Sequence, residues 1–422
     1  MKIKIKEKSL KEVLSLPNQK RLKPKKPSIF FRTLVRLVSL FDLKKVNFTY
    51  SGKIDKKSGP YLILMNHSSF IDLKIASKIL YPMPFNIVST HDAFIGKAWL
   101  MRNLGCIPTR KFISDLSLIS NMRSCLKNNT SVLMYPEAGY SLDGKATALP
   151  ENFGRLVKVL NVPVIFIRAD GAFSRDPLYN GLQLRKVPVS ATVTTLISSE
   201  ELKTLSLEEI DDRINNAFNF DNFLWQKENG INITENFRAD GLERILYRCA
   251  HCQTEGKMVG KGTKVICQSC GKSYTLTELG ELVADDDNTK FSHVPDWFSW
   301  QREKVKEQII SGEYILDTPV DIYVVKDYKA LYKVGKGKLK HDISGFELTS
   351  ADDKLIYNQS PLSSYSLNVD YFWYEIGDVI CIGDENALYY CFPSKEVSVA
   401  KVRLATEEIY KLQKDKLKSN KN

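Results

Sequence analysis

The sequence lacks an uninterrupted apolar run of the roughly 18 to 20 residues that a helix needs to cross a bilayer. It also lacks an apolar segment behind the positively charged stretch Met1–Lys26, so the charge of a signal peptide is present without its hydrophobic part. The chain has no internal repeat. These absences argue against a transmembrane helix and a secretory signal, and we expect a cytosolic or peripheral protein.

Surplus charge is absent from most of the chain and concentrated in one region. The 422 residues carry a formal net charge of +12, yet residues 1–60 alone hold 17 Lys and Arg against 4 Asp and Glu. The rest of the chain holds 44 against 45. A basic arm of this kind binds nucleic acid or an anionic bilayer.

The segment that follows the arm favours the bilayer. In SIFFRTLVRLVSLF (Ser28–Phe41), Arg32 and Arg36 lie off one apolar helical face. This pattern predicts a basic amphipathic helix in an anionic headgroup layer, which would place the protein peripherally on the cytoplasmic face of the membrane. A core-packing helix with a solvated basic side is the alternative. The predicted apolar face consists of Phe31, Leu34, Val35, Val38 and Phe41.

Short apolar segments alternate with helical patterns from about residue 28 to residue 245. Apolar strands without a polar face predict an α/β fold with a central, mostly parallel or mixed sheet flanked by helices. The expected strands are 61–65, 85–88, 131–135, 162–169 and 190–197. The expected helices are 72–80, 93–104, 114–128 and 152–161, with an acidic helix or helix pair at 206–230.

The C-terminal part predicts an antiparallel β domain closed by a helix. Its element order resembles the pleckstrin-homology-like architecture. The expected strands lie in 320–325, 329–341, 345–350, 354–360, 365–383, 386–393 and 397–402, and the expected helix is 404–420. We therefore expect four parts: a basic arm (1–27), an α/β domain with the amphipathic helix (28–245), a cysteine module (246–284) and the β-rich domain (285–422).

The stretch YLILMNHSSFIDL (Tyr61–Leu73) carries the first candidate chemistry. His67 should lie in the turn after strand 61–65, with Asp72 in the first turn of the next helix. Ser68 or Ser69 is the expected N-cap of that helix, and SFID matches a capping box. On one continuous helix, residues five apart would point about 140° apart, but a turn lets the two side chains converge. Asp72 would then fix the tautomer of His67 and leave its other nitrogen to accept a proton from a hydroxyl. A purely structural histidine is the alternative.

Three further blocks accompany this one. NHSSFID is the N-H-x4-D motif of the glycerolipid acyltransferases, and the chain resembles the 1-acylglycerol-3-phosphate acyltransferase group. LGCIPTR (104–110) is similar to the second block, Gly-x-Ile-Pro-x-Arg. YPEAGYS (135–141) is similar to the third, usually Phe-Pro-Glu-Gly-Thr-Arg-Ser, and VPVIFI (162–167) to the fourth, usually Val-Pro-x-x-Pro-Val.

The resemblance implies a transferase of phospholipid biosynthesis. His67 would be the general base and Asp72 its orienting partner, while the acceptor hydroxyl attacks the thioester of acyl-CoA or acyl-carrier protein. The expected acceptor is a lysophospholipid, most simply 1-acyl-sn-glycerol-3-phosphate. Arg110 would bind its phosphate, and the pocket would be shaped by Glu137, Gly139 and Ser141.

Two departures from the family pattern concern the acceptor. Tyr140 stands where the third block has arginine, and tyrosine cannot form the charged fork that binds phosphate. The glycine of that block has moved from the position of Ala138 to Gly139, and Phe166 replaces a proline of the fourth block. Either Arg110 and nearby cations suffice, or the acceptor is a glycolipid, another polyol lipid or a lysophospholipid with a larger headgroup. The nearby cations are Lys111, Lys145 and Arg155.

The cysteine module predicts a zinc ribbon. CAHCQTEGKMVGKGTKVICQSC places two C-x2-C pairs fourteen residues apart, and two such knuckles complete a four-thiolate site. Because protein fills all four positions, the Zn²⁺ would be structural. The module has no dense basic and aromatic surface, so a nucleic-acid partner is not expected, although a non-enzymatic zinc-ribbon binding protein is a further alternative. The predicted ligands are Cys249, Cys252, Cys267 and Cys270.

Overall fold

The computed structural model describes residues 3–19, 22–113, 115–352 and 354–420, and these form two compact units. The α/β unit contains the described residues of Lys20–Pro177 and Gln183–Asn229. The β-rich unit contains those of Met1–Gln19, Leu178–Leu182 and Gly230–Asn422. The chain therefore passes from one unit to the other several times, and the four parts predicted from the sequence stay predictions.

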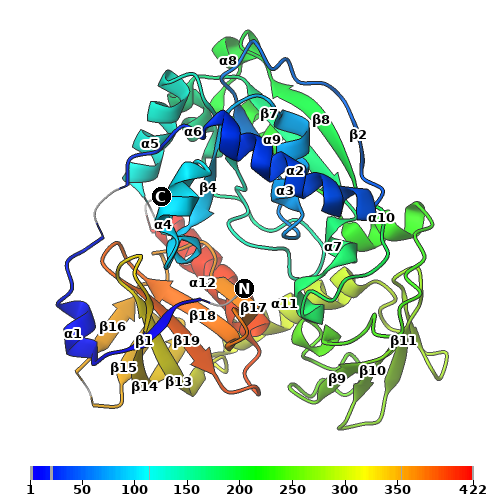
Figure 1. The fold of residues 1–422 in the computed structure, drawn as a ribbon. Coiled ribbons are helices and arrows are strands. Elements are labelled where there is room, and N and C mark those ends of the chain that lie inside the picture. The colour runs from blue at the N-terminus through cyan, green and yellow to red at the C-terminus, as the bar shows by residue number, and fades with distance from the viewer. Residues whose placement is uncertain (1–2, 20–21, 114, 353, 421–422) are drawn as a thin grey trace. The chain divides into compact units, whose positions relative to one another are not determined.

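A sheet forms the centre of the α/β unit, and β2, β4, β7 and β8 are labelled in Figure 1. It has seven strands in the order β2-β8-β7-β3-β6-β4-β5. All neighbours are parallel except β7 and β8, so the expected mostly parallel or mixed sheet is confirmed. The strands are β2 (Thr49–Ser51), β3 (Leu62–Met65), β4 (Phe85–Thr90), β5 (Cys106–Thr109), β6 (Ser131–Met134), β7 (Val164–Asp170) and β8 (Ser190–Ile197).

Helices cover the sheet because its strands are apolar on both faces. Leu62 and Leu64 belong to a buried cluster with residues of α5, α6 and α9, while Ile63 and Met65, which point the other way, are equally buried. The helical segments are α2 (Ile29–Lys45), α3 (Asp72–Leu80), η1 (His91–Phe94), α4 (Ala98–Asn103), α5 (Leu116–Lys127), α6 (Phe153–Leu160), α7 (Ala172–Arg175), α8 (Glu201–Thr204), α9 (Leu207–Ala217) and α10 (Asn222–Glu228). Ser114, in the predicted helix 114–128, lies outside the described residues.

Helix α2 packs against α3 and runs antiparallel to it. In its middle, the Arg36 guanidinium lies 4.3 Å from the Tyr81 ring centre, just past the end of α3. Near its end, Asp42 accepts a hydrogen bond from Lys74, in the first turn of α3, at 2.5 Å. Ser28 caps the helix by accepting a hydrogen bond from the backbone N–H of Phe31.

The exposed face of α2 is apolar. Phe30 is 67% exposed and Phe41 is 74% exposed, and the other members of the stripe follow at helical spacing. The exposed apolar face differs from the predicted one by a fraction of a helical turn. Phe31 and Val35, which were predicted to lie on it, are half-buried, and Phe31 packs on Trp99 at 6.1 Å between ring centres. The apolar stripe consists of Phe30, Leu34, Leu37, Val38 and Phe41. Among the helices described, none has both the length and the apolarity for a membrane span.

The larger sheet of the β-rich unit has the order β16-β15-β14-β13-β19-β18-β17, with β1 added in parallel to β14. All other neighbours are antiparallel, so the expected series of antiparallel strands with a C-terminal helix is confirmed. The elements are β13 (Leu316–Val325), β14 (Leu331–Asp342), β15 (Gly345–Ser350), β16 (Ile356–Gln359), β17 (Asn368–Trp373), β18 (Gly377–Gly383), β19 (Leu388–Pro393) and α12 (Val399–Ser419). The strand expected at 397–402 is wrong, because these residues begin α12.

Part of the N-terminal basic segment is folded. Strand β1 (Ile5–Glu7) and helix α1 (Leu10–Leu14) belong to the β-rich unit, and Leu10 and Val13 are buried there. Ser9 and Glu12 form a capping box at the start of α1. Of the predicted arm, residues 1–2 and 20–21 lie outside the described part of the chain.

The cysteine module is a four-stranded antiparallel sheet in the order β12-β11-β10-β9. It is followed by α11 (Val294–Ser311), a helix that the sequence interpretation did not include. Gln301 of α11 accepts a hydrogen bond from the backbone of Arg248 and donates one to the carbonyl of Ile245. The remaining elements are β9 (Met258–Lys261), β10 (Lys264–Cys267), β11 (Ser273–Leu276), β12 (Leu282–Ala284), η2 (Leu178–Asn180) and η3 (Leu242–Arg244).

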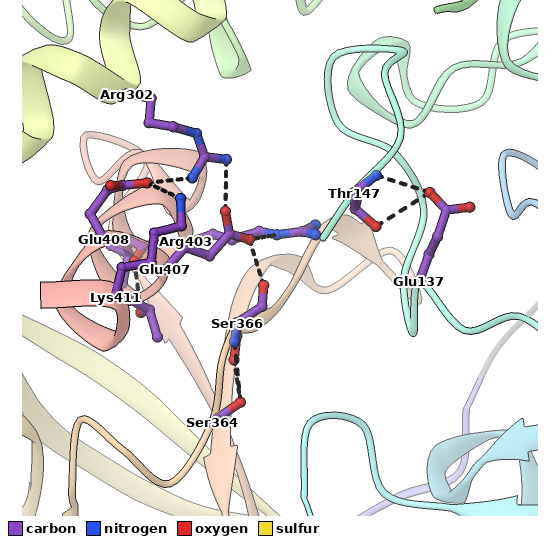
Figure 2. Close-up of polar contacts among 11 residues, drawn as sticks. Glu137, Thr147, Arg302, Ser364, Ser366, Arg403, Glu407, Glu408 and Lys411 are labelled. Atoms are coloured by element: carbon purple, nitrogen blue, oxygen red, sulfur yellow. Dashed lines mark hydrogen bonds and ion pairs between the residues drawn. The ribbon is translucent and has the colours of Figure 1, made fainter. Parts of the chain in front are cut away.

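Helices α11 and α12 are joined by buried ion pairs (Figure 2). Arg302 lies 2.7 Å from Glu407 and 3.0 Å from Glu408, and Arg403 adds a second contact to Glu407 at 3.0 Å. Burial alone would raise the pKa of Glu407, but the two arginine charges lower it to about 2. Removing one partner would leave a buried charge unpaired, so the network fixes how these two helices pack.

Candidate functional site

The carboxyl ends of four adjacent parallel strands meet at one edge of the α/β sheet. In the order β3-β6-β4-β5, these strands are followed by His67, Glu137, His91 and Arg110. Ligand sites of open α/β sheets form at this edge. Residues that lie far apart in the sequence are therefore gathered where the strand order places them.

His67 and Asp72 converge as the motif predicts. His67 Nδ1 lies 3.0 Å from Asp72 Oδ2, and the same oxygen accepts hydrogen bonds from the backbone N–H groups of Ser68 and Ser69 at 2.9 and 3.1 Å. Asp72 is only 1% exposed. Because a carboxylate accepts, Nδ1 carries the hydrogen and Nε2 keeps its lone pair. The imidazole is thus oriented with Nε2 available as a base.

The predicted capping box forms only in part. Asp72 Oδ2 accepts a hydrogen bond from the backbone N–H of Ser69, but the Ser69 hydroxyl accepts from the backbone N–H of Ile71 at 3.3 Å, not from that of Asp72, and donates to Asp176 Oδ1 at 2.6 Å. The helix accordingly starts without a side-chain cap. The backbone N–H groups of Ser68 and Ser69 thus hold the Asp72 carboxylate in the position in which it orients His67.

Two tyrosines cover the imidazole. The ring centre of Tyr135 lies 4.1 Å from that of His67 at an interplanar angle of 21°, and that of Tyr140 lies 4.3 Å away at 34°. Two six-membered rings this close would overlap on one side, so they cover opposite faces. Burial, with the charge of Asp72, raises the pKa of Tyr135 well above its usual value. Aromatic faces favour a cation between them, which is what His67 becomes when it accepts a proton.

Glu137 is a buried support of the site. One carboxylate oxygen accepts from the backbone N–H of His67 at 3.0 Å, and the other accepts from the backbone and hydroxyl of Thr147 at 3.0 and 3.3 Å (Figure 2). With 0% exposure, Glu137 positions the His67 turn and the loop that follows β6. Its predicted place in an acceptor pocket stays a prediction.

The rest of the third block shapes that loop. Ser141 is fully buried, donates to the carbonyl of Lys145 at 2.6 Å and accepts from the backbone N–H of Gly144 at 2.9 Å. Ala138 has a φ of 55°, the left-handed region that favours glycine, whereas a Cβ on Gly139 would meet no atom within 4 Å. The left-handed position of this loop is therefore occupied by alanine, and Gly139, one place later, has no positive φ.

Arg110 follows β5 at the same edge as His67. Three strand spacings separate β5 from β3, which amounts to about 14 Å between strand axes. Burial and the charge of Arg110 lower the pKa of His91 to about 3, so His91 is neutral and Arg110 is the cation at this end. Two of the other cations named from the sequence have different surroundings from Arg110. Lys145 pairs with Asp221 at 3.9 Å, and Arg155 is exposed.

Asp176 is a part of the site that no sequence signal indicated. It is 4% exposed, lies 3.1 Å from Arg175 and accepts the hydrogen bond from Ser69. Burial raises its pKa to about 6 in spite of Arg175. The Ser69–Asp176 contact joins residues 107 positions apart, a separation at which local pattern carries no information.

The four predicted cysteines come together in the β-rich unit. All four Sγ atoms lie within 4.8 Å of one another, with Cys249–Cys270 at 3.9 Å and Cys252–Cys267 at 3.7 Å. Zinc with four thiolates at about 2.3 Å sets its sulfur atoms roughly 3.8 Å apart, so the cluster fits the ion. A hydrogen bond with Thr254 lowers the pKa of Cys252 to about 6, which favours the thiolate that a metal needs.

The match to a protein family agrees with this geometry. Residues 45–168 match the family described as Acyltransferase, so this part of the α/β unit is an acyltransferase-family domain. Among solved structures, the chain is similar to PlsC, a 1-acyl-sn-glycerophosphate (LPA) acyltransferase from Thermotoga maritima, with 15% identity, a TM-score of 0.36, and coverage of 44% of this chain and 76% of that one. The assignment rests on the family match. None of the curated proteins matches the chain.

Proposed function

We propose that the α/β unit transfers a fatty acyl chain from acyl-CoA or acyl-carrier protein to the hydroxyl of a glycerolipid. The observation that carries the proposal is the 3.0 Å contact between His67 Nδ1 and a buried Asp72, which leaves Nε2 available. Nε2 takes the proton of the acceptor hydroxyl as its oxygen bonds to the thioester carbonyl carbon. The C–S bond then breaks, and the thiolate leaves with the proton that the imidazolium returns.

The first candidate acceptor is 1-acyl-sn-glycerol-3-phosphate. Arg110 supports it, because its guanidinium stands at the catalytic edge and forms no ion pair with the residues described. A guanidinium binds a phosphate through two parallel hydrogen bonds. Lysophosphatidic acid would then lie across the ends of β6 and β4, with its free hydroxyl at His67 and its phosphate toward Arg110.

A phosphate-free or larger-headgroup acceptor is the second candidate, and one observation favours it. Tyr140, which replaces the family's arginine, stacks on His67, and its ring lies 5.7 Å from that of Phe70. Phe70 is 63% exposed. An aromatic wall beside the base suits the apolar face of a sugar or polyol better than a phosphate.

Peripheral attachment to an anionic membrane on its cytoplasmic face completes the proposal. The apolar stripe of α2 supports it, because five large apolar side chains at helical spacing face solvent on a helix flanked by lysines. Replacing Phe41 with Ser should weaken binding to anionic vesicles by roughly tenfold or more. Leu116, which is 79% exposed on α5, offers the matched control Leu116→Ser, which should bind normally.

Product analysis tests the enzymatic proposal directly. The purified full chain is incubated with acyl-CoA or acyl-carrier protein and a mixed panel of lysophosphatidic acid, larger lysophospholipids and glycolipids, and the products are identified by mass spectrometry. An acylated lipid that His67→Ala protein does not produce is the expected result. A preference for phosphate-free acceptors would replace the first candidate by the second, and equal product from wild type and His67→Ala would contradict both.

The ribbon has a structural part in this proposal. Four thiolates leave no open position for substrate or water, so we assign Zn²⁺ to holding the module together. No step of the acyl transfer is assigned to it.

A further inference from the structure

A cavity lies at the edge of the α/β sheet opposite His67. Its walls include Pro60, Ser131 and Pro84, which stand at the amino ends of β3, β6 and β4. Because His67 follows the carboxyl end of β3, this cavity is separate from the catalytic edge. Its volume of about 350 Å³ lies at the lower end of the range of small-ligand sites.

The cavity is lined by cations and by no acid. None of its lining residues is Asp or Glu, and two of the cations, Lys26 and Lys57, form no hydrogen bond or ion pair through their ammonium groups with the residues described. The amide of Asn129 is likewise unused. The polar lining consists of Lys26, Arg32, Lys56, Lys57, Asn129 and Ser131.

The cations around the cavity outnumber the nearby acids: Asp55 interacts with Lys57, whereas Arg32 and Lys56 form no ion pair with the residues described. Arg32 donates from Nη1 to the carbonyl of Pro82, while the buried Nε atoms of Arg32 and Arg36 have no hydrogen-bond partner among the described residues. Lys56 donates to the carbonyl of Tyr81 at 2.7 Å. Burial, with the charges of Arg36 and Lys78, lowers the pKa of Lys56, and burial lowers that of Arg32. Desolvated like charges destabilise one another unless an anion binds between them.

We propose that this cavity is an anion site that binds the phosphate group of an anionic phospholipid. Lysine ammonium groups, a guanidinium and an amide are donors suited to phosphate oxygens. The choice of a lipid as the source of the phosphate rests on the proposed membrane association, whereas the anion site itself does not.

The geometry of α2 is the reason for choosing a lipid. Arg32 lies in the wall of the cavity, and Phe30 and Leu34 of the apolar stripe stand within two positions of it on the same helix. Since α2 runs antiparallel to α3, the stripe extends from the cavity toward Lys74 and the catalytic edge. A leaflet that holds the stripe therefore places a headgroup at the cavity and the lipid acceptor near His67.

Vesicle sedimentation and phosphate titration test the site with one pair of variants. Lys26→Gln/Lys57→Gln removes two cavity cations, and Lys44→Gln/Lys45→Gln removes two charges from the far end of α2 as the matched control. An exposed lysine near an anionic surface contributes about fivefold to affinity, so both variants lose some binding to phosphatidylglycerol vesicles. We expect the affinity of the cavity variant for these vesicles to fall about tenfold more than that of the control. Binding of either variant to phosphatidylcholine vesicles should equal that of wild type.

Inorganic phosphate separates the two sources of the anion. In one outcome, inorganic phosphate binds to wild type and to the control variant but not to the cavity variant, while vesicle binding falls equally in both variants. That result would confirm the anion site and refute a lipid as the source of its phosphate. Equal vesicle binding by the two variants without any phosphate binding overturns the site itself. Acyl transfer to a dispersed short-chain acceptor should be the same in all three proteins, and its absence from all three, with the binding differences intact, would refute the proposed enzyme activity alone.

Discussion

His67 is held by contacts of two kinds, a carboxylate at one nitrogen and aromatic rings on both faces. The carboxylate fixes which nitrogen is free, so Asp72→Asn should lower kcat by about 10²- to 10⁴-fold and leave KM nearly unchanged. Steady-state kinetics with the acceptor found by product analysis measures this. Asp170→Asn, at the same sheet edge and paired with Arg168 at 2.9 Å, is the control and should keep its rate. A rise in KM without loss of kcat would instead place Asp72 in substrate binding.

The displaced glycine of the third block makes a second prediction at the residue scale. Ala138 adopts a left-handed φ of 55°, which costs an L-residue roughly 1 kcal/mol, partly offset by the greater freedom of glycine in the unfolded chain. Ala138→Gly should therefore leave the free energy of unfolding unchanged or raise it by up to about 1 kcal/mol. Gly139→Ala should also leave it unchanged or raise it by up to about 1 kcal/mol, since open space surrounds the added Cβ and glycine has more freedom in the unfolded chain. Urea unfolding of both variants checks the pair, and a loss of about 1 kcal/mol or more in Ala138→Gly would contradict the left-handed strain at this position.

Asp176 predicts a dependence of stability on pH. Burial raises its pKa from 3.8 to about 6, so between these values the folded protein holds a proton that the unfolded chain releases. Raising the pH through this window therefore lowers the free energy of unfolding, by up to about 3 kcal/mol. Asp176→Asn keeps an acceptor for Ser69 but cannot ionise. We expect this variant to match wild type near pH 4 and to exceed it at pH 7.5 in urea unfolding; a constant difference across the window would refute the shifted carboxyl.

At the scale of elements, the zinc ribbon depends on its metal. A four-stranded sheet of strands only three or four residues long has a small core, so metal binding supplies much of its folding energy. Cys252→Ser/Cys270→Ser should abolish one equivalent of zinc, measured by mass spectrometry of the metal, and lower the unfolding temperature of the protein. Cys125→Ser, at a buried thiol of the α/β unit, should keep its zinc. Full zinc content in the double variant would contradict the site.

Elements with a clear period or spacing could be predicted, and those decided by packing could not. Helix α3 was expected at 72–80 and lies there, because apolar residues recur at helical spacing. Helix α11 was not predicted because the polar Gln301 occupies a core position. Its side-chain amide forms hydrogen bonds with the backbone of residues some fifty positions away, which the local sequence does not indicate. VSVAKV (397–402) alternates like a strand, but Ser398 caps the backbone of Lys401 and starts α12.

At the scale of the whole molecule, a short segment between the two stretches that form the α/β unit belongs to the other unit. Tyr179 is fully buried in the β-rich unit, and Asn180 donates to the carbonyls of Phe237 and Asp240 at 3.0 and 2.8 Å. Asn180→Ala leaves both carbonyls without this donor, at a cost of about 1 to 3 kcal/mol, and should expose the segment. Limited chymotrypsin digestion of the full chain should then cut after Tyr179 faster than in wild type.

Asn229→Ala is the control for this digestion, because the Asn229 side chain makes an exposed hydrogen bond to Trp225 at the end of α10. It should be cut at the wild-type rate. Cleavage after Tyr179 that is equally fast in wild type and in Asn180→Ala would show that the segment is not held by these contacts.

The sequence by itself determined what short spacing can encode. The histidine and the aspartate five positions apart, and two cysteine pairs of fixed spacing, define their chemistry within a turn or a knuckle, so the catalytic pair and the zinc ligands could be named before any fold was known. Only the tertiary structure decided which distant groups complete them. Glu137 reaches the backbone of His67 across 70 residues, and Asp176 reaches Ser69 across 107. The cations of the cavity gather at the opposite edge of the sheet from segments that no local pattern connects.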